Sequence, residues 1–216
     1  MMGEVDQGVV AKALDWAYES AINGLPGMGT AEELAADYRK EDGSVQDQAN
    51  ALIRWQIAKC ATSGFLTGLG GIITLPVAIP ANLSSVLYVQ IRMIAAIAAL
   101  GGHDVRSDQV KTMIYACLCG SSIVEVVRGA GIKVGMKITE NIIKGISKEI
   151  IVNINKAVGF RLVTKFGTTG VVNLGKTIPL VGGLIGGTMD AISTNTIGNI
   201  ARDVFVLGEL SESYAN

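Results

Sequence analysis

The chain has 216 residues, which is enough for one domain with a substantial core or at most two small ones. Hydrophobic residues make up 49% of it and charged residues 17%, whereas an ordinary soluble domain carries about 25% charged residues. The net charge of −1 provides no overall field that would attract nucleic acid. With a mean hydropathy of +0.42, the composition instead favours a membrane or a large partner interface.

Charge is distributed unevenly along the chain. Most of the charged residues in 1–50 are acidic, and most of the charged residues in 131–176 are basic. An anionic lipid surface attracts such a basic segment, and the candidates for this contact are Lys133, Lys137, Lys144, Lys148, Lys156, Arg161 and Lys165. Two alternatives are a solvated helix face and mutual neutralisation of the two halves within one fold.

Helix start signals recur in the first half of the chain. "VVAKALDWAYESAI" places apolar residues on one stripe, and "NGLPGMG" ends it with turn residues. Thr30 with Glu33 forms a capping-box pattern, and Ser44 with Asp47 predicts the next start. Ser107 predicts another helix start. Trp16 and Trp55 lie on amphipathic stripes, where a core position is favoured over the alternative of an interface anchor.

The stretch 131–167 is predicted to be helical, with glycine interruptions at Gly135, Gly145 and Gly159. "KEIIVNI" is rich in β-branched residues and is also compatible with a strand, but the surrounding pattern favours a helix.

Two apolar segments differ from the rest of the chain. Residues 60–91 contain no charged residue and are long enough to span a bilayer, although Pro76 and Pro80 argue against one straight helix. A hairpin, either buried or dipping into a membrane, fits this pattern better. The second segment, "TIPLVGGLIGGTMDAISTNTIGNIARDVF", has the small-xxx-small spacing typical of close helix packing, at Gly182, Gly183, Gly186 and Gly187.

Polar residues within these apolar segments are expected to be paired, because burying an unpaired charge is costly. Arg92 is predicted to pair with an acid, and Asp190 is the best candidate. Such a pair would tie the two apolar segments together as a buried clamp. Gln90 and Asn195 are further candidates for this clamp. A ligand site between the segments is the alternative interpretation.

The segment "GVVNLGKT", Gly170 to Thr177, matches the phosphate-loop pattern G-x-x-x-x-G-K-[ST]. A working loop joins a strand to a long helix, but Pro179 and four glycines follow at once. The alternation of strands and helices that such folds need is also missing. We therefore interpret the match as accidental and expect no nucleotide binding.

No other catalytic or cofactor pattern stands out in the sequence. His103 is the single histidine, so histidine-pair metal sites are excluded, and a polar loop is its expected position. Cys60, Cys117 and Cys119 lie in apolar stretches of the sequence and are expected to be free thiols. A reducing compartment is therefore expected. No catalytic, cofactor-binding or metal-binding residue is predicted.

Three long stretches resemble a known family: "ALDWAYESAINGLPGMGTAEELA", "ALIRWQIAKCATSGFLTGLGGIITLPVAIPANLSSVLYVQIRMIAAIAALGG" and "VGFRLVTKFGTTGVVNLGKTIPLVGGLIGGTMDA". Together they resemble the EcsC protein family of bacteria, most specifically in the run LP-x-x-x-P…Q-x-R-M-I. The run is also similar to a helical membrane-associated domain found beside some bacterial dynamin-like and Era-like GTPases. The resemblance implies an α-helical fold near a membrane and brings no catalytic residues.

The sequence thus predicts one all-α domain, a multi-helix bundle around two Gly/Pro-interrupted apolar hairpins. Its expected parts are acidic helices (1–43), an apolar core (44–130), a basic segment (131–176) and glycine-rich C-terminal helices (177–216). The expected function is non-catalytic association with membrane or lipid. The expected location is the bacterial cytoplasm, peripheral to or inserted in the cytoplasmic membrane, and no signal peptide is predicted. The alternatives are a soluble protein-interaction module or homo-oligomer and, less favoured, a lipid-acting hydrolase.

Overall fold

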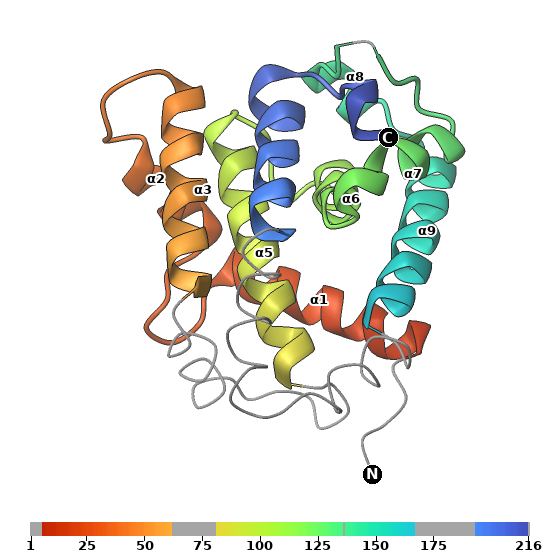
Figure 1. Cartoon of the computed structure of the whole chain (residues 1–216), viewed down its shortest axis with the longest axis horizontal. Coiled ribbons are helices and arrows are strands. Elements are labelled where there is room, and N and C mark those ends of the chain that lie inside the picture. The colour runs from red at the N-terminus through yellow and green to blue at the C-terminus, as the bar shows by residue number, and fades with distance from the viewer. Residues whose placement is uncertain (1–5, 62–80, 136, 167–192, 216) are drawn as a thin grey trace.

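The computed structural model describes residues 6–61, 81–135, 137–166 and 193–215 (Figure 1). Within these ranges the chain folds into helices joined by turns, and the only β-type pairings are two isolated bridges, Leu25 with Met28 and Lys137 with Glu209. The all-α fold class predicted from the sequence is confirmed.

The helices vary from one to five turns in length. The N-terminal half contains α1 (Gln7–Asn23), α2 (Ala31–Tyr38), α3 (Val45–Ala61) and α5 (Ala81–Leu100). The rest contains α6 (Asp108–Cys117), α7 (Ile123–Gly129), α8 (Glu140–Lys144), α9 (Lys148–Phe166) and a C-terminal helix (residues 193–202) that continues as the π-helical turn Asp203–Leu207. Short 3₁₀ turns cover Gly120–Ser122 and Glu212–Ala215.

Side-chain caps explain where several of these helices begin. Thr30 and Glu33 form the predicted capping box: the Thr30 hydroxyl accepts from the Glu33 N–H at 3.0 Å, and the Glu33 carboxylate accepts from the Thr30 N–H at 2.8 Å. Ser44 and Asp47 satisfy each other's backbone N–H groups in the same way before α3. Ser107 caps α6 through the N–H of Val110. The predicted start signals are confirmed.

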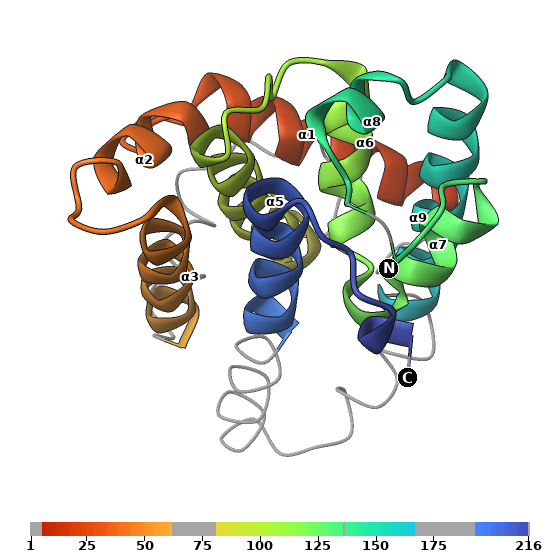
Figure 2. The ribbon, with the colours of Figure 1, turned by 90° about the horizontal axis from the view of Figure 1, so that it is seen from above.

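Helix α5 is the centre of the bundle. It packs against α1, α2, α3 and α6 and against the π-helical turn (Figures 1 and 2). Its residues from Val89 to Leu100 are buried except for Arg92, which is half-buried. A helix that is apolar on all sides has to be covered on all sides in water, and the neighbouring helices provide that cover.

Helix α9 lies on the outside of this core, where it contacts α6, α7 and α1 (Figure 2). One of its faces buries Ile154, Val158 and Leu162, whereas Val152 and Phe160 are exposed. The structure therefore confirms a helix rather than a strand for "KEIIVNI".

Two glycines permit close contacts between elements. A Cβ atom at Gly198 would lie 2.9 Å from Cγ1 of Ile53, so the C-terminal helix and α3 approach closely at this point. At Gly101, just after α5, a Cβ atom would collide with the backbone of Phe205 in the π-helical turn. The absence of a side chain at these two glycines therefore permits the close approach of the elements.

Several helix ends point to one side of the bundle. Helix α3 ends, α5 begins, α9 ends and the C-terminal helix begins toward the lower edge of Figure 1. The chain continues from these ends into residues 62–80 and 167–192. The first of these two segments contains no charged residue, and the second contains only Lys176 and Asp190.

Three expectations from the sequence are wrong in detail. The described residues between 131 and 139 form no helix, because helical structure resumes only at Glu140. Gly159 lies inside α9 and does not interrupt it, whereas Gly145 ends α8 as predicted. Trp55 is 54% exposed and not part of the core, because the stripe that α3 buries contains Leu52, Ile53 and Gln56 instead.

Candidate functional site

Arg92 does not contact a carboxylate among the described residues. Its Nε donates to the carbonyl oxygen of Gly29, in the turn between α1 and α2, at 3.0 Å. Asp190, its predicted partner, lies outside the described residues, as do Gly182, Gly183, Gly186, Gly187 and the Gly170–Thr177 pattern. Within the described part of the chain, Arg92 thus joins α5 to the α1–α2 turn.

Gln90 forms a buried polar link between the two apolar segments. Its side chain is 3% exposed, and its Nε2 donates to the hydroxyl of Thr194, itself 1% exposed, at 3.4 Å. Asn195, the neighbour of Thr194, is exposed and accepts a hydrogen bond from Asn199 on its own helix. Of these two candidates, Gln90 joins α5 to the C-terminal helix, and Asn195 does not.

The basic candidates occupy several positions around α8 and α9. Lys133 and Lys137 are exposed on the non-helical segment before α8, and Lys148 and Lys156 are exposed on α9. Lys144 pairs with Glu140 at 2.6 Å on the exposed surface. Arg161 pairs with Glu125 of α7, and Lys165 donates to the hydroxyl of Ser193 at 3.1 Å.

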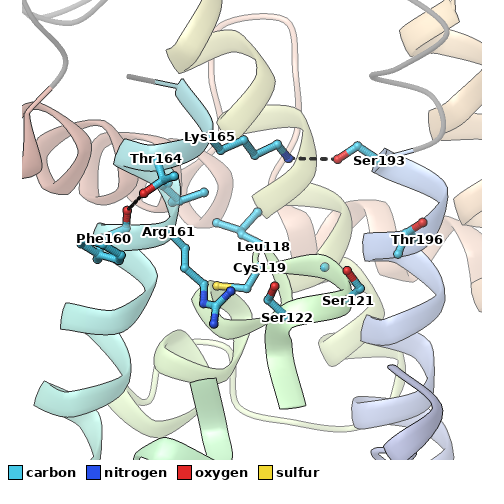
Figure 3. A pocket seen from close by; sticks show the side chains of 12 residues that line it. Leu118, Cys119, Ser121, Ser122, Phe160, Arg161, Thr164, Lys165, Ser193 and Thr196 are labelled. Atoms are coloured by element: carbon cyan, nitrogen blue, oxygen red, sulfur yellow. Dashed lines mark hydrogen bonds between the residues drawn. The ribbon is translucent and has the colours of Figure 1, made fainter. Parts of the chain in front are cut away.

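Arg161 and Lys165 also line a cavity of about 570 Å³ (Figure 3). Its wall is built by residues 118–122 between α6 and α7, by residues 160–162 and 164–165 of α9, and by Ser193 and Thr196 of the C-terminal helix. Hydroxyl groups and the two cations alternate with apolar side chains around it. None of these described lining residues is an acid. The wall of the cavity therefore combines polar and apolar groups.

Cys119 lies in the wall of this cavity, close to Arg161 in Figure 3. Burial raises the pKa of the Cys119 thiol to about 11, although the charges of Arg161 and Lys165 act to lower it. The thiol is thus protonated at neutral pH and is a poor nucleophile. Cys117 is fully buried, and burial raises the pKa of its thiol as well.

His103 lies in the turn after α5, as predicted, but its ring is partly buried and packs edge-on against Phe205. Its Nε2 donates to the Phe205 carbonyl at 3.0 Å, so Nδ1 carries the lone pair of the neutral ring and has no hydrogen-bond partner. Burial lowers the pKa of His103. Its ring nitrogens contact neither a serine nor an acid within the described residues, and no metal-binding cluster of His, Cys, Asp or Glu occurs among those residues.

Comparison with known protein families shows which family the chain belongs to. The family model described as the EcsC protein family matches residues 43–207, well over half of the chain. The chain belongs to the EcsC protein family. The matched region of this EcsC protein includes α3, α5 and every residue that lines the cavity. No curated protein and no solved structure was found to match the chain.

Sequence reasoning identified only part of this cavity in the EcsC chain. Arg161 and Lys165 were candidates because they belong to a basic segment, but Ser121, Ser193 and Thr196 were not. Short polar residues in apolar surroundings are common at helix ends, so nothing in the sequence links these positions. They come together because α9 and the C-terminal helix lie on either side of the α6–α7 turn (Figure 3).

Proposed function

We propose that this EcsC-family protein is a non-catalytic protein that associates with anionic membrane surfaces through the outer face of α9. The observation that carries the proposal is the pattern of exposed residues on that helix. Val152 is 63% exposed and Phe160 is 62% exposed, and both lie among exposed lysines.

The spacing places these residues on one face. Lys148, Val152, Lys156 and Phe160 follow each other at intervals of four residues, so they lie along one side of the helix within about three turns. Lys148 and Lys156 form no ion pair with another described residue. Apolar side chains would enter the headgroup region, and the flanking ammonium groups would contact lipid phosphates.

The expected affinity is modest. Each lysine near an anionic surface contributes about 1 kcal/mol, and full burial of a Val or Phe side chain contributes about 1.5–3 kcal/mol. Binding of this kind is reversible and weakens with salt, because a Debye length of about 8–10 Å near physiological ionic strength screens exposed charges.

Vesicle sedimentation tests the proposal. The wild-type chain is expected to bind vesicles of phosphatidylglycerol and phosphatidylcholine (3:7) at low salt and to bind pure phosphatidylcholine vesicles weakly. The double variant Lys148→Gln/Lys156→Gln is expected to lose about 2 kcal/mol of binding free energy, about 30-fold in affinity. Phe160→Ser is expected to weaken binding further.

The matched control is Lys12→Gln/Arg54→Gln, which removes the same charge from exposed positions on α1 and α3. It is expected to change vesicle affinity less than twofold. Equal losses in the two double variants would show that bulk charge, and not the α9 face, drives binding. Absence of wild-type binding to the anionic vesicles at low salt would refute the proposal.

A soluble interaction module is the second candidate, and the burial of α5 favours it. The stretch Leu83–Leu100 is long and apolar enough to cross a membrane, but 89% of it is buried inside the bundle, as the core helix of a soluble protein would be. Under this reading the exposed Trp55 and Phe160 contact a protein partner or a second copy. A concentration-dependent dimer in analytical ultracentrifugation, together with no vesicle binding, would support this candidate over the first.

A further inference from the structure

We propose that the last described turn of the chain, residues 211–215, is a salt-sensitive strap that opens without the rest of the bundle and controls access to Cys117 at the end of α6. This device goes beyond the function proposed above and does not depend on it. The strap contains the 3₁₀ turn Glu212–Ala215 and packs against α7 and the turn Gly120–Ser122 (Figure 1).

The chain is held in place as far as Leu210. The carbonyl oxygen of Gly208 accepts a hydrogen bond from the N–H of Ile138 at 2.6 Å. The N–H of Glu209 donates to the carbonyl oxygen of Asp203 at 2.8 Å. Leu210 is 1% exposed and belongs to the core. Because opening up to this point would break backbone hydrogen bonds and expose an apolar side chain, the strap begins after Leu210.

The backbone of the strap has no hydrogen bond to another described part of the chain. The N–H of Tyr214 donates to the carbonyl oxygen of Ser211 at 3.3 Å, and the N–H of Ser213 donates to the hydroxyl of Ser211 at 3.1 Å. Ser211, Glu212 and Ser213 are exposed. A segment with few buried contacts and an exposed backbone opens at a small fraction of the free energy of global unfolding, and the strap is such a segment.

Two side-chain contacts hold the strap closed. Glu212 pairs with Arg128 of α7 at 3.0 Å, where both side chains are more than half exposed. The Tyr214 hydroxyl donates to Oδ2 of Asp203, whose Oδ1 accepts from Arg202 at 2.7 Å. Salt screens the first contact because it lies on the surface, whereas the second contact is largely protected, since the Asp203 side chain is 17% exposed.

Tyr214 connects the strap to Cys117. Burial and the hydrogen bond to Asp203 raise the pKa of Tyr214 to about 12, and Cys117 lies near enough to contribute to the same shift. The phenol therefore stays protonated at neutral pH and remains a donor to Asp203. Cys117 is fully buried, and Tyr214 packs against the same core. Displacement of Tyr214 would therefore open a path from solvent to the Cys117 thiol.

Cys119 provides an internal reference in the same turn. It lies in the wall of the cavity close to Arg161 of α9 (Figure 3). None of the described residues that line this cavity belongs to the strap. The two cysteines thus report on different neighbours: Cys117 reports on the strap, and Cys119 reports on the cavity beside α9.

Thiol labelling of the full chain with N-ethylmaleimide tests the strap, with peptide mass spectrometry to assign the labelled cysteine. When opening and closing are faster than labelling, the rate follows the population of the open strap. Tyr214→Phe is expected to raise the labelling rate of Cys117 about tenfold, and Arg128→Gln about threefold. The labelling rate of Cys119 is expected to change less than about twofold in both variants.

Two matched controls accompany these variants. Tyr38→Phe removes the hydroxyl of another half-buried tyrosine, in α2. Lys144→Gln breaks an exposed ion pair with Glu140 on α8. Each control is expected to change the labelling rate of Cys117 less than about twofold, because neither residue contacts the strap.

Salt provides a second test that needs no unfolding-prone variant. An increase in sodium chloride from about 50 mM to about 500 mM is expected to raise the labelling rate of wild-type Cys117 about twofold to threefold, because the pair between Arg128 and Glu212 is screened. Arg128→Gln should lose this salt dependence, and Lys144→Gln should keep it.

The inference is overturned if Tyr214→Phe accelerates the labelling of Cys117 and Cys119 by the same factor, since that result means that the whole bundle has loosened. It is also overturned if wild-type Cys117 labelling does not respond to salt, or if urea below the unfolding transition accelerates it as steeply as urea lowers global stability. A local opening exposes little surface and therefore depends weakly on urea. Vesicle binding enters none of these results, so the proposed function and the strap are tested separately.

Discussion

Replacing Gly101 by alanine tests the close contact between the end of α5 and the π-helical turn. An added Cβ atom would lie 2.9 Å from the carbonyl carbon of Phe205 and closer still to its oxygen. Carbon atoms make their best contact at about 3.5–4.0 Å, so the overlap is at least about 0.6 Å. The obstacle is backbone, which cannot rotate away as a side chain can. We expect a destabilisation of about 2–3 kcal/mol, within the range of overpacked cores.

Thermal unfolding followed by circular dichroism measures this effect. For a chain of this size, about 1 kcal/mol corresponds to about 2–4 °C, so Gly101→Ala should lower the midpoint by about 4–12 °C. The matched control is Gly159→Ala inside α9, where an added Cβ atom meets nothing within 4 Å. That change should stabilise the protein by about 0.5–1 kcal/mol, because alanine favours the helix. A midpoint for Gly101→Ala equal to the wild type would refute the packing of α5 against this turn.

Three further predictions concern buried and capping groups. Gln90→Ala should lower the free energy of unfolding in urea by about 2 kcal/mol, because it removes a buried side chain and leaves the hydroxyl of Thr194 without this donor. The control Asn195→Ala should change the free energy of unfolding by less than about 0.5 kcal/mol. Equal effects of the two variants would contradict a clamp at Gln90. Burial lowers the pKa of His103, so the unfolded chain binds more protons at this residue than the folded chain, and stability should fall as pH drops below about 6.5. His103→Gln keeps an N–H donor for the Phe205 carbonyl and should reduce the dependence of stability on pH. The same pH dependence in the variant and the wild type would contradict the burial of a neutral ring. Thr30→Ala should cost about 1 kcal/mol by removing the capping box, and unchanged stability would show that the cap contributes nothing in solution.

The local signals in the sequence were reliable where the chemistry is local. Thr30, Ser44 and Ser107 mark helix starts because each hydroxyl reaches an N–H group within the next three residues, and no other part of the chain is needed. The same holds for Gly145 at the end of α8. The segment after Ala130 was predicted less well, because its backbone bond from Ile138 to the carbonyl of Gly208 depends on a residue far along the chain.

The candidate site was predicted only as a charge bias. A basic segment was visible, but the sequence could not separate Lys148 and Lys156, which project outward, from Arg161 and Lys165, which line the cavity. That difference follows from the rotation of α9 against α6 and α7, which is set by the packing of Ile154, Val158 and Leu162. The exposure of Trp55 was not predicted for the same reason, because an amphipathic pattern does not indicate which residues of the apolar face contact the neighbouring helices.

By itself, the sequence determined the all-helical class and most helix starts, because propensity and capping act within a few residues. Only the tertiary structure decided that Gln90 meets Thr194, that Arg92 turns to the Gly29 carbonyl, and that hydroxyls and cations from three separate segments surround one cavity. Such contacts depend on how helices dock, and docking is selected by the fit of whole faces, which no short stretch of sequence encodes.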